Sequence, residues 1–223
     1  MIDQLLFNDY KNSNHASLGE LINSLFQHCT SEVLAIRINV NYKVEYRDRI
    51  TLEMVQEHRR HLFDNRRRNT TLFGDLLGYG WCLEYGVLSG FHHHLLFLFD
   101  GQQRRSDINL GLSIAKYIDT VITGGMSHSH VSNVNKHQYE REGTLGIGAI
   151  AHNEITLRNN LLKIVAGYMT KGSIHDSARE FLPDGTAFRT FGRSALPRPK
   201  PDWQSHAGRP RSTEVKRGVS HGK

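Results

Sequence analysis

Three consecutive histidines, His92, His93 and His94, lie in an otherwise apolar run of residues. In a β-strand, residues two apart project from the same face, so His92 and His94 can offer two imidazoles to one divalent ion, whereas His93 faces the opposite side and needs a partner there. A chain with 14 histidines among 223 residues contains about one His-x-His pair by chance, so the spacing alone decides little. The pair gains meaning from the apolar residues 95–99 that follow it, because burying a histidine costs free energy unless its nitrogens are partnered.

A carboxylate is expected next to this pair. Residues 78–85 and 91–99 are rich in β-forming side chains and are separated by a short connection that contains Gly and Ser, which predicts an antiparallel hairpin. Glu84 is the only acidic residue of the first strand. Pairing across the turn brings it close to His92 and His94.

Glu84, His92 and His94 together form an open set of metal ligands. Two neutral imidazoles and one carboxylate are typical of a catalytic Mg²⁺ or Mn²⁺ that polarises a phosphate, and less so of a closed structural zinc site. The alternative is a solvent-facing histidine cluster without a metal. We interpret the second pair, His128 and His130, in that way, because its polar, Ser- and Asn-rich surroundings indicate a loop.

Tyr168 and Lys171 could supply a nucleophile and a cation. They are three residues apart near the end of a predicted helix and therefore share one face. A tyrosine hydroxyl has an ordinary pKa of about 10, and a nearby phosphate held by a metal, together with a lysine ammonium, would ease its deprotonation. The same pair also fits an ordinary amphipathic helix, so the histidines upstream are what favours chemistry here.

Hydrophobic periodicity predicts the elements that position these residues. Apolar residues follow helical spacing over residues 17–29, 51–67, 107–122 and 153–171, and they alternate over residues 32–42, which predicts a half-buried strand. Two weaker strands are expected between residues 128 and 151. The order of elements, α-β-α-β-β-α-β-β-α, indicates an α+β fold in which an antiparallel sheet carries helices on one face.

Positive charge gathers at the C-terminal end. The net charge is +6, and residues 195–223 hold seven Lys or Arg residues against two acidic ones, with four of the five prolines. This composition predicts a basic, disordered tail that neutralises phosphates or merely aids solubility. Arg37 on the first strand and Arg66, Arg67 and Arg68 at the end of the second helix are further candidate DNA contacts, although arginines at a helix C-terminus also suit the helix dipole.

Targeting and redox signals are lacking in the sequence. No apolar run approaches the roughly 20 residues that span a bilayer, and the first residues carry no basic segment followed by an apolar one. Cys29 and Cys82 are too few for a disulfide framework or a cysteine-built zinc site. We therefore expect a cytoplasmic protein with no membrane partner.

The motifs together resemble a known group of enzymes. The order Glu84, His92-His93-His94, long helix and Tyr168-Met169-Thr170-Lys171 is similar to that of the HUH endonucleases, rolling-circle replication initiators with a His-hydrophobic-His metal motif and a Tyr-x-x-Lys nucleophile motif. More closely, WCLEYGVLSGFHHHLLFLFDG, GIGAIAHNEITLRNNLLKIVAGYMTKG and RTFGRS resemble inovirus-type replication proteins of the YagK/YfjJ-like family. The likeness covers residues 32–194.

This resemblance implies a fold, a chemistry and partners. It implies an RRM-like or ferredoxin-like sheet in residues 31–194, preceded by an N-terminal helical segment (residues 1–30) and followed by the basic tail (residues 195–223). It implies that Tyr168, aided by Lys171 and the divalent metal, attacks single-stranded DNA at a replication origin and leaves a 5′-phosphotyrosine and a free 3′-hydroxyl. The partners implied are a helicase and a polymerase of a bacterial host cell. The chain has no Gly-x-x-x-x-Gly-Lys-Ser/Thr loop, so any helicase must come from another protein.

Two residues depart from the family pattern. His93 replaces an aliphatic residue, and Asn39 occupies a position on the first strand where an acidic residue often occurs. We interpret Asn39 as a contact to DNA or to water on the metal. A non-catalytic DNA-binding regulatory protein on the same fold is therefore the main alternative. An RNA-binding protein is a third, which leaves the histidines and Tyr168 without a joint purpose.

Overall fold

The computed structural model describes residues 12–179 and 188–197 of the chain. Its strands are β1 (Glu32–Tyr42), β2 (Leu76–Gly86), β3 (Gly90–Asp100), β4 (Ser127–Val131), β5 (Gly148–Ala151) and β6 (Phe191–Arg193). Its α-helices are α2 (Asn12–His28), α3 (Leu52–Asn65), α4 (Thr70–Phe73), α5 (Asp107–Tyr117), α6 (Lys136–Arg141), α7 (Ile155–Asn160), α8 (Gly167–Met169) and α9 (Gly172–Arg179). Between them lie 3-10 turns, η1 (Val44–Arg49) and η3 (Ser132–Asn135), and π-helical turns, η2 (Ile118–Ile122) and η4 (Leu161–Ala166).

The long elements lie where hydrophobic periodicity predicts them. β1 covers the alternating segment, β2 and β3 form the predicted hairpin, and the predicted helix over residues 153–171 is the succession α7, η4 and α8. The interpretation of His128 and His130 as part of a loop is wrong, because both lie on β4 with their side chains exposed. An edge strand of alternating Ser and His has the composition of a loop, and only its pairing with β1 distinguishes the two.

The strands form one antiparallel sheet in the order β4-β1-β3-β2-β6, with β5 paired to β1 as well. β4 pairs with the second half of β1 and β5 with its first half, so both lie along the same edge of β1. The β2–β3 hairpin closes with Gly86 opposite Gly90, whose φ of 68° is a conformation that glycine adopts without strain. β3 therefore lies at the centre of the sheet, where its side chains meet those of both neighbours.

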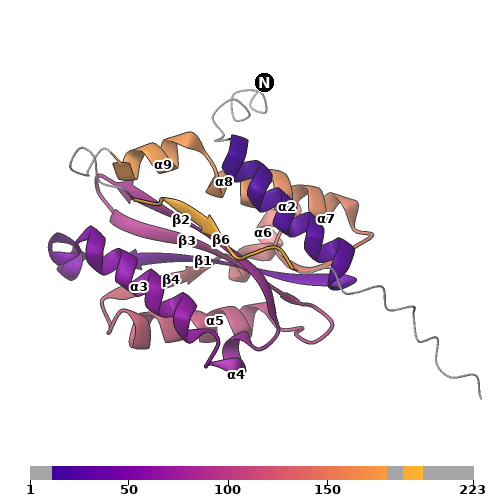
Figure 1. Cartoon of the computed structure of the whole chain (residues 1–223). Helices are drawn as coiled ribbons and strands as arrows, with labels where there is room; N and C mark the ends of the chain where they lie inside the picture. The colour runs from indigo at the N-terminus through magenta and orange to yellow at the C-terminus, as the bar shows by residue number, and fades with distance from the viewer. Residues whose placement is uncertain (1–11, 180–187, 198–223) are drawn as a thin grey trace, which may run out of the picture.

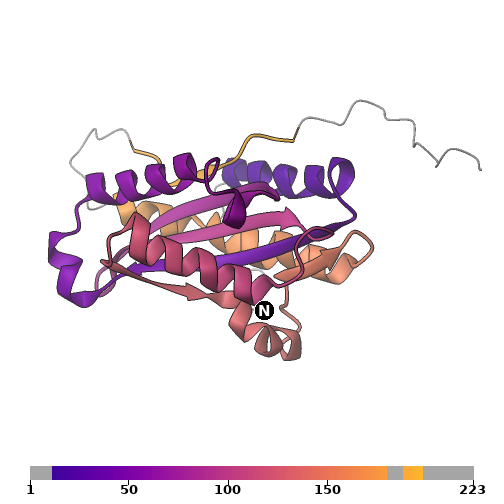
Figure 2. The same ribbon diagram turned by 90° about the horizontal axis from the view of Figure 1, so that it is seen from below.

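Helices cover both faces of the sheet (Figure 1). α2, η4 and α8 pack on one face, around Leu21, Leu96 and Val165, whereas α3, α4 and α5 pack on the other, around Ile36 and Phe97. Figure 2, seen from below, shows α3 and α5 lying across this second face. The predicted α+β class with an antiparallel sheet is confirmed. The sequence interpretation expects helices on one face only, whereas helices cover both faces, because β3 is buried along nearly its whole length and both of its sides need cover.

The N-terminal helix α2 shares the core of the sheet. Leu18, Leu21 and Leu25 are fully buried in the cluster that also contains Val165 and Leu96. α2 is therefore packed as an integral layer on the face that carries Glu84, His92 and His94. The predicted basic tail lies almost entirely outside the described residues and stays a prediction. Within the described ranges, no helix has the length and apolar character that crossing a membrane requires.

Candidate active site

Glu84, His92 and His94 converge on the sheet face that α2 and α8 cover. Glu84 lies opposite His92 in the β2–β3 ladder, and His94 follows two residues later on the same face. Oε2 of Glu84 lies 3.1 Å from Nε2 of His92 and 2.8 Å from Nε2 of His94. One ligand atom from each residue lies within 4.8 Å of the others, which is compatible with a single shared ion. The hairpin pairing inferred from the sequence thus brings these three side chains together.

The second nitrogen of each imidazole already has a partner. Nδ1 of His94 lies 2.8 Å from Oδ1 of Asn39, and Nδ1 of His92 lies 3.1 Å from the carbonyl oxygen of Gly90. Because both partners are acceptors, a neutral ring carries its proton on Nδ1, and the Nε2 lone pairs then point at Glu84. Lone pairs that face a carboxylate oxygen repel it unless a proton or a cation lies between them. The donor set therefore fits a divalent cation whose ligands are oriented by Asn39 and Gly90.

Each of the three groups has a perturbed pKa. Without a cation, Nε2 of His92 and of His94 must carry a proton to donate to Glu84, and these hydrogen bonds hold the pKa of the Glu84 carboxyl well below its usual range, so this group is ionised. Burial opposes the charged form of His92, but its hydrogen bonds to Glu84 and to the Gly90 carbonyl raise its pKa. Burial lowers the pKa of His94 and favours its neutral form. The ionised Glu84 and the neutral His94 are in the states that metal binding requires, whereas a metal would have to displace the proton that the raised pKa of His92 favours.

His93 lies on the opposite face of the sheet, as the alternation of a strand predicts. Its side chain is buried, with Nδ1 3.4 Å from the carbonyl oxygen of Cys82 and Nε2 3.5 Å from that of Val55. Its ring packs edge-on against Trp81, with 6.2 Å between the ring centres. Burial lowers the pKa of His93 to about 3. His93 is therefore a neutral core residue that points away from the cluster of Glu84, His92 and His94.

Tyr168 lies directly beside this cluster. Its ring packs edge-on against that of His94, with 5.1 Å between the ring centres. Nζ of Lys171 lies 5.5 Å from the centre of the Tyr168 ring, so the Tyr-x-x-Lys pair is also brought together. Burial raises the pKa of Tyr168, and the negative charge of Glu84 raises it further, whereas Arg37 lowers it. A cation next to Glu84 would neutralise that charge and ease formation of the tyrosinate.

Arg37 lies closer to Tyr168 than the sequence indicated. It lies on β1 two residues before Asn39, on the same face, and its guanidinium carbon is 4.7 Å from the centre of the Tyr168 ring. Its Nε atom is buried and has no hydrogen-bond partner among the described residues. Arg37 is therefore a cation beside Tyr168 whose Nε lacks the partner that a buried donor needs. The sequence singled out Arg37 as a DNA contact but not as a neighbour of the tyrosine.

No match was found among protein-family models, curated proteins or solved structures. The likeness to the inovirus-type replication proteins therefore rests on the motif residues and stays a prediction. The geometry itself establishes a cluster of Glu84, His92 and His94 that could hold a metal ion, with Tyr168 packed against it.

The other candidate DNA contacts lie away from this cluster. Arg66 lies on the opposite face of the sheet, with its guanidinium carbon 5.0 Å from the centre of the Tyr79 ring. Arg67 and Arg68 are exposed just beyond the end of α3, the helix that packs on that face. These three arginines are therefore not positioned to touch a molecule bound at His92 and His94, and their role as DNA contacts stays a prediction.

His128 and His130 lie closer to the cluster than their sequence context suggested. Across the β1–β4 ladder, His130 is opposite Asn39 and His128 is opposite Asn41. Asn39 and Asn41 are in turn opposite His94 and His92 on β3. The polar face of the sheet thus continues from the candidate ligands to the exposed edge of β4. The Ser-x-Ser alternation around His128 and His130 was the only sequence signal for this strand.

The charges around Tyr168 define what the site can do. A bound divalent cation, Arg37 and Lys171 would outweigh the single negative charge of Glu84 and attract an anion. The anion would meet Tyr168 as the nearest group that can act as a nucleophile. A phosphodiester fits this combination of cations and an oxygen nucleophile.

Proposed function

We propose that this chain is a metal-dependent DNA nickase and strand transferase that uses Tyr168 to start rolling-circle replication of a phage or related mobile element. The observation that carries the proposal is the packing of Tyr168 against His94, one of three residues that could ligate a metal. An ordinary tyrosine at the edge of the core would not be expected to pack against a candidate metal ligand. Its place beside candidate ligands and two cationic side chains suits attack on a phosphate.

The chemistry is a phosphoryl transfer to tyrosine. A divalent ion bound by Glu84, His92 and His94 would withdraw charge from the scissile phosphate. The Tyr168 oxygen attacks phosphorus and the bond from phosphorus to the 3′ oxygen breaks. The phenolic proton is lost to solvent and the departing oxygen takes one up, so the products are a 5′-phosphotyrosine and a free 3′-hydroxyl. Attack by another 3′-hydroxyl on the phosphotyrosine reverses these steps and joins the strands.

Arg37 and Lys171 have complementary parts in this reaction. Both lie over the Tyr168 ring, at 4.7 and 5.5 Å from its centre, so both stabilise negative charge on its oxygen. The guanidinium of Arg37 can also stabilise a phosphate oxygen as charge builds up there. Asn39 does not touch the substrate in this scheme and acts by fixing the tautomer of His94.

A covalent adduct is the direct test of this proposal. The protein would be incubated with a labelled pool of random-sequence single-stranded oligonucleotides and Mn²⁺, then separated under denaturing conditions. We expect a protein band that carries the label in Mn²⁺ and not in EDTA, with the DNA attached to the peptide that contains Tyr168. DNA binding without any adduct would reject the nickase.

The alternative is a non-catalytic DNA-binding regulatory protein on the same fold. The raised pKa of Tyr168 favours it, because burial and Glu84 both oppose the nucleophilic tyrosinate. Under this alternative, a metal at Glu84, His92 and His94 would only anchor a phosphate. The adduct experiment separates the two functions, since both predict DNA binding and only the nickase predicts a covalent product.

A further inference from the structure

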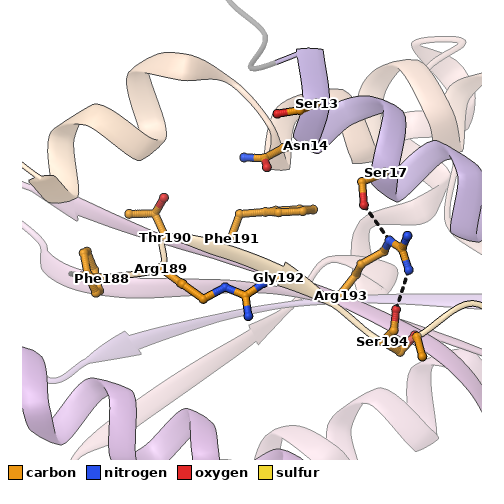
Figure 3. A pocket seen from close by; sticks show the side chains of 11 residues that line it. Ser13, Asn14, Ser17, Phe188, Arg189, Thr190, Phe191, Gly192, Arg193 and Ser194 are labelled. Atoms are coloured by element: carbon orange, nitrogen blue, oxygen red, sulfur yellow. Dashed lines mark hydrogen bonds between the residues drawn. The ribbon is translucent and has the colours of Figure 1, made fainter.

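A polar cavity of about 510 Å³ lies beside β6, at the edge of the sheet opposite β4. Figure 3 shows the residues that line it: Ser13, Asn14 and Ser17 approach from α2, while Arg189, Phe191 and Arg193 come from the segment that includes β6. The sequence interpretation included residues 189–194 in the family resemblance but predicted neither a strand nor a cavity there. No acidic residue lines it within the described part of the chain.

Two arginines give the cavity its charge. Arg193 is held in place: its Nε donates to the Ser17 hydroxyl at 2.7 Å and a second nitrogen donates to the Ser194 carbonyl at 2.8 Å, while Glu20 lies 3.3 Å away at the surface. Arg189 is exposed, and its guanidinium has no carboxylate partner among the described residues. One fixed and one unneutralised guanidinium in the same cavity suit a phosphate ligand.

A third arginine strengthens the positive potential at this place. Arg59 of α3 lies with its guanidinium carbon 3.9 Å from the centre of the Trp81 ring and reaches the carbonyl oxygen of Arg189 at 3.5 Å. The positive charge of Arg189 adds to the effect of burial in lowering the pKa of Arg59, which means that the two guanidinium groups repel each other. A bound anion would relieve this repulsion.

The cavity lies on the same side of the sheet as the candidate active site and in line with it. Phe191 of β6 is opposite Cys82 of β2, and Cys82 is opposite His94 of β3. Neighbouring strands are about 4.8 Å apart, so Phe191 is about 10 Å from His94 across the sheet. Cys82 between them is buried in the core, so a strand that contacts both places has to pass over the helices that cover it.

We propose that this cavity binds single-stranded DNA on one side of the cleaved bond, with a phosphate at Arg189 and Arg193 and a base on the ring of Phe191. The inference rests on the proposed function, because it assigns a further contact of the same substrate. Cationic grooves that carry an aromatic platform are the usual means of holding single strands without sequence preference. Ala195 also lines the cavity.

Binding to oligothymidylates of increasing length tests the proposal. The Tyr168→Phe background prevents cleavage, so affinity is measured by fluorescence anisotropy without any nick. Arg189→Ala is compared with Arg141→Ala, which removes an exposed arginine at the end of α6, away from the cavity. We expect both variants to bind short oligonucleotides equally, and Arg189→Ala to lose about tenfold in affinity once the strand is long enough to span both sites. The slope of log affinity against log salt should fall by about 1 for the long strand.

A labelling experiment locates the strand independently. Ser13→Cys places an exposed thiol at the cavity, and peptide mass spectrometry separates its modification by maleimide from that of Cys29. Long oligothymidylates should protect this thiol, and short ones should not. Equal affinities of Arg189→Ala and Arg141→Ala at every length would overturn the proposal, and so would a thiol that long strands leave unprotected.

The outcomes for the cavity and for the nickase are separable. A length-dependent loss in Arg189→Ala without any covalent adduct in the unmutated protein would leave the cavity as a DNA site and reject the nickase. An adduct on Tyr168 with no effect of Arg189→Ala would do the reverse. A thiol at position 13 that becomes reactive only after residues 1–11 are deleted would assign the cavity to the chain's own N-terminal segment and overturn the DNA assignment.

Discussion

The Nδ1 atom of His94 lies 2.8 Å from Oδ1 of Asn39, on the side of the ring that faces away from Glu84. The contact explains how an amide can serve at a position where the endonucleases that the motifs resemble often carry an acid. Either group accepts the Nδ1 proton and so leaves Nε2 free for a metal.

Asn39→Ala should therefore weaken metal binding about 10- to 100-fold, the usual cost of losing such an orienting partner. Asn39→Asp should retain the affinity, because the carboxylate accepts the same proton. Titration calorimetry with Mn²⁺ measures both variants. An affinity for Asn39→Ala that equals that of the unmutated protein would show that the Asn39 contact does not orient the ligand.

Glu84→Gln, His92→Ala and His94→Ala should each abolish stabilisation by Mn²⁺. A ligand at about 100 times its dissociation constant stabilises the folded state by about 2.7 kcal/mol, and a missing ligand removes this increment. The melting temperature with and without Mn²⁺ gives the measurement, and His130→Ala, from the exposed edge of the same sheet face, is the matched control. Equal stabilisation of the His94→Ala protein would exclude the site.

The candidate ligands could be predicted from the sequence because they depend on local pairing. A strand alternates its faces and a short turn sets the hairpin register, so Glu84 had to meet His92 and His94 once the two strands were recognised. The Tyr168–Lys171 pair is also local, since the turn that ends α8 holds both, with the Lys171 N–H donating to the Tyr168 carbonyl oxygen at 3.3 Å. Patterns of this kind need no knowledge of the tertiary structure.

Other features depend on packing between distant segments and could not be predicted. β6 has three residues, too few for any periodicity, and exists because it pairs with the edge of β2. Arg37 meets Tyr168 only because α8 packs over β1. The second helical layer follows from burial of both faces of β3. A continuous apolar run in the sequence fits either a fully buried strand or a buried helix, so it does not predict this layer.

Arg37→Gln should slow adduct formation at saturating DNA by about 100-fold, as expected when a donor to the developing charge is lost. Arg37→Lys should restore part of the rate because it keeps the charge and loses the planar donor geometry. Single-turnover kinetics with a cleavable oligonucleotide separates this effect from binding. If Arg37 served binding alone, the dissociation constant would rise while the saturated rate stayed unchanged.

His93 should make the folded state sensitive to acid. Its pKa is about 3 when folded and about 6.5 when unfolded, so below pH 6.5 the unfolded chain takes up a proton that the folded protein does not. Stability is thus fully present above that pH and is lost as the pH falls toward 3. One pKa unit corresponds to about 1.36 kcal/mol, so the contribution lost by pH 5 is about 2 kcal/mol.

His93→Leu should remove this loss while the other histidines contribute equally to both proteins. The free energy of unfolding, measured in urea with EDTA at pH 7.5 and pH 5, should therefore decrease by about 2 kcal/mol less in the variant. The same decrease in both proteins would mean that His93 is protonated in the folded state.

Tyr168→Phe tests the central claim most directly, because it removes only the attacking oxygen and keeps the ring that packs against His94. Tyr139→Phe, at a half-buried tyrosine packed against the same core cluster, is the matched control. With labelled single-stranded DNA and Mn²⁺, Tyr168→Phe should form no covalent adduct and bind DNA within a few-fold of the unmutated protein, while Tyr139→Phe should form the adduct normally. An adduct that persists in Tyr168→Phe would contradict the account and move the nucleophile to another tyrosine, with Tyr139 and Tyr117 the next candidates.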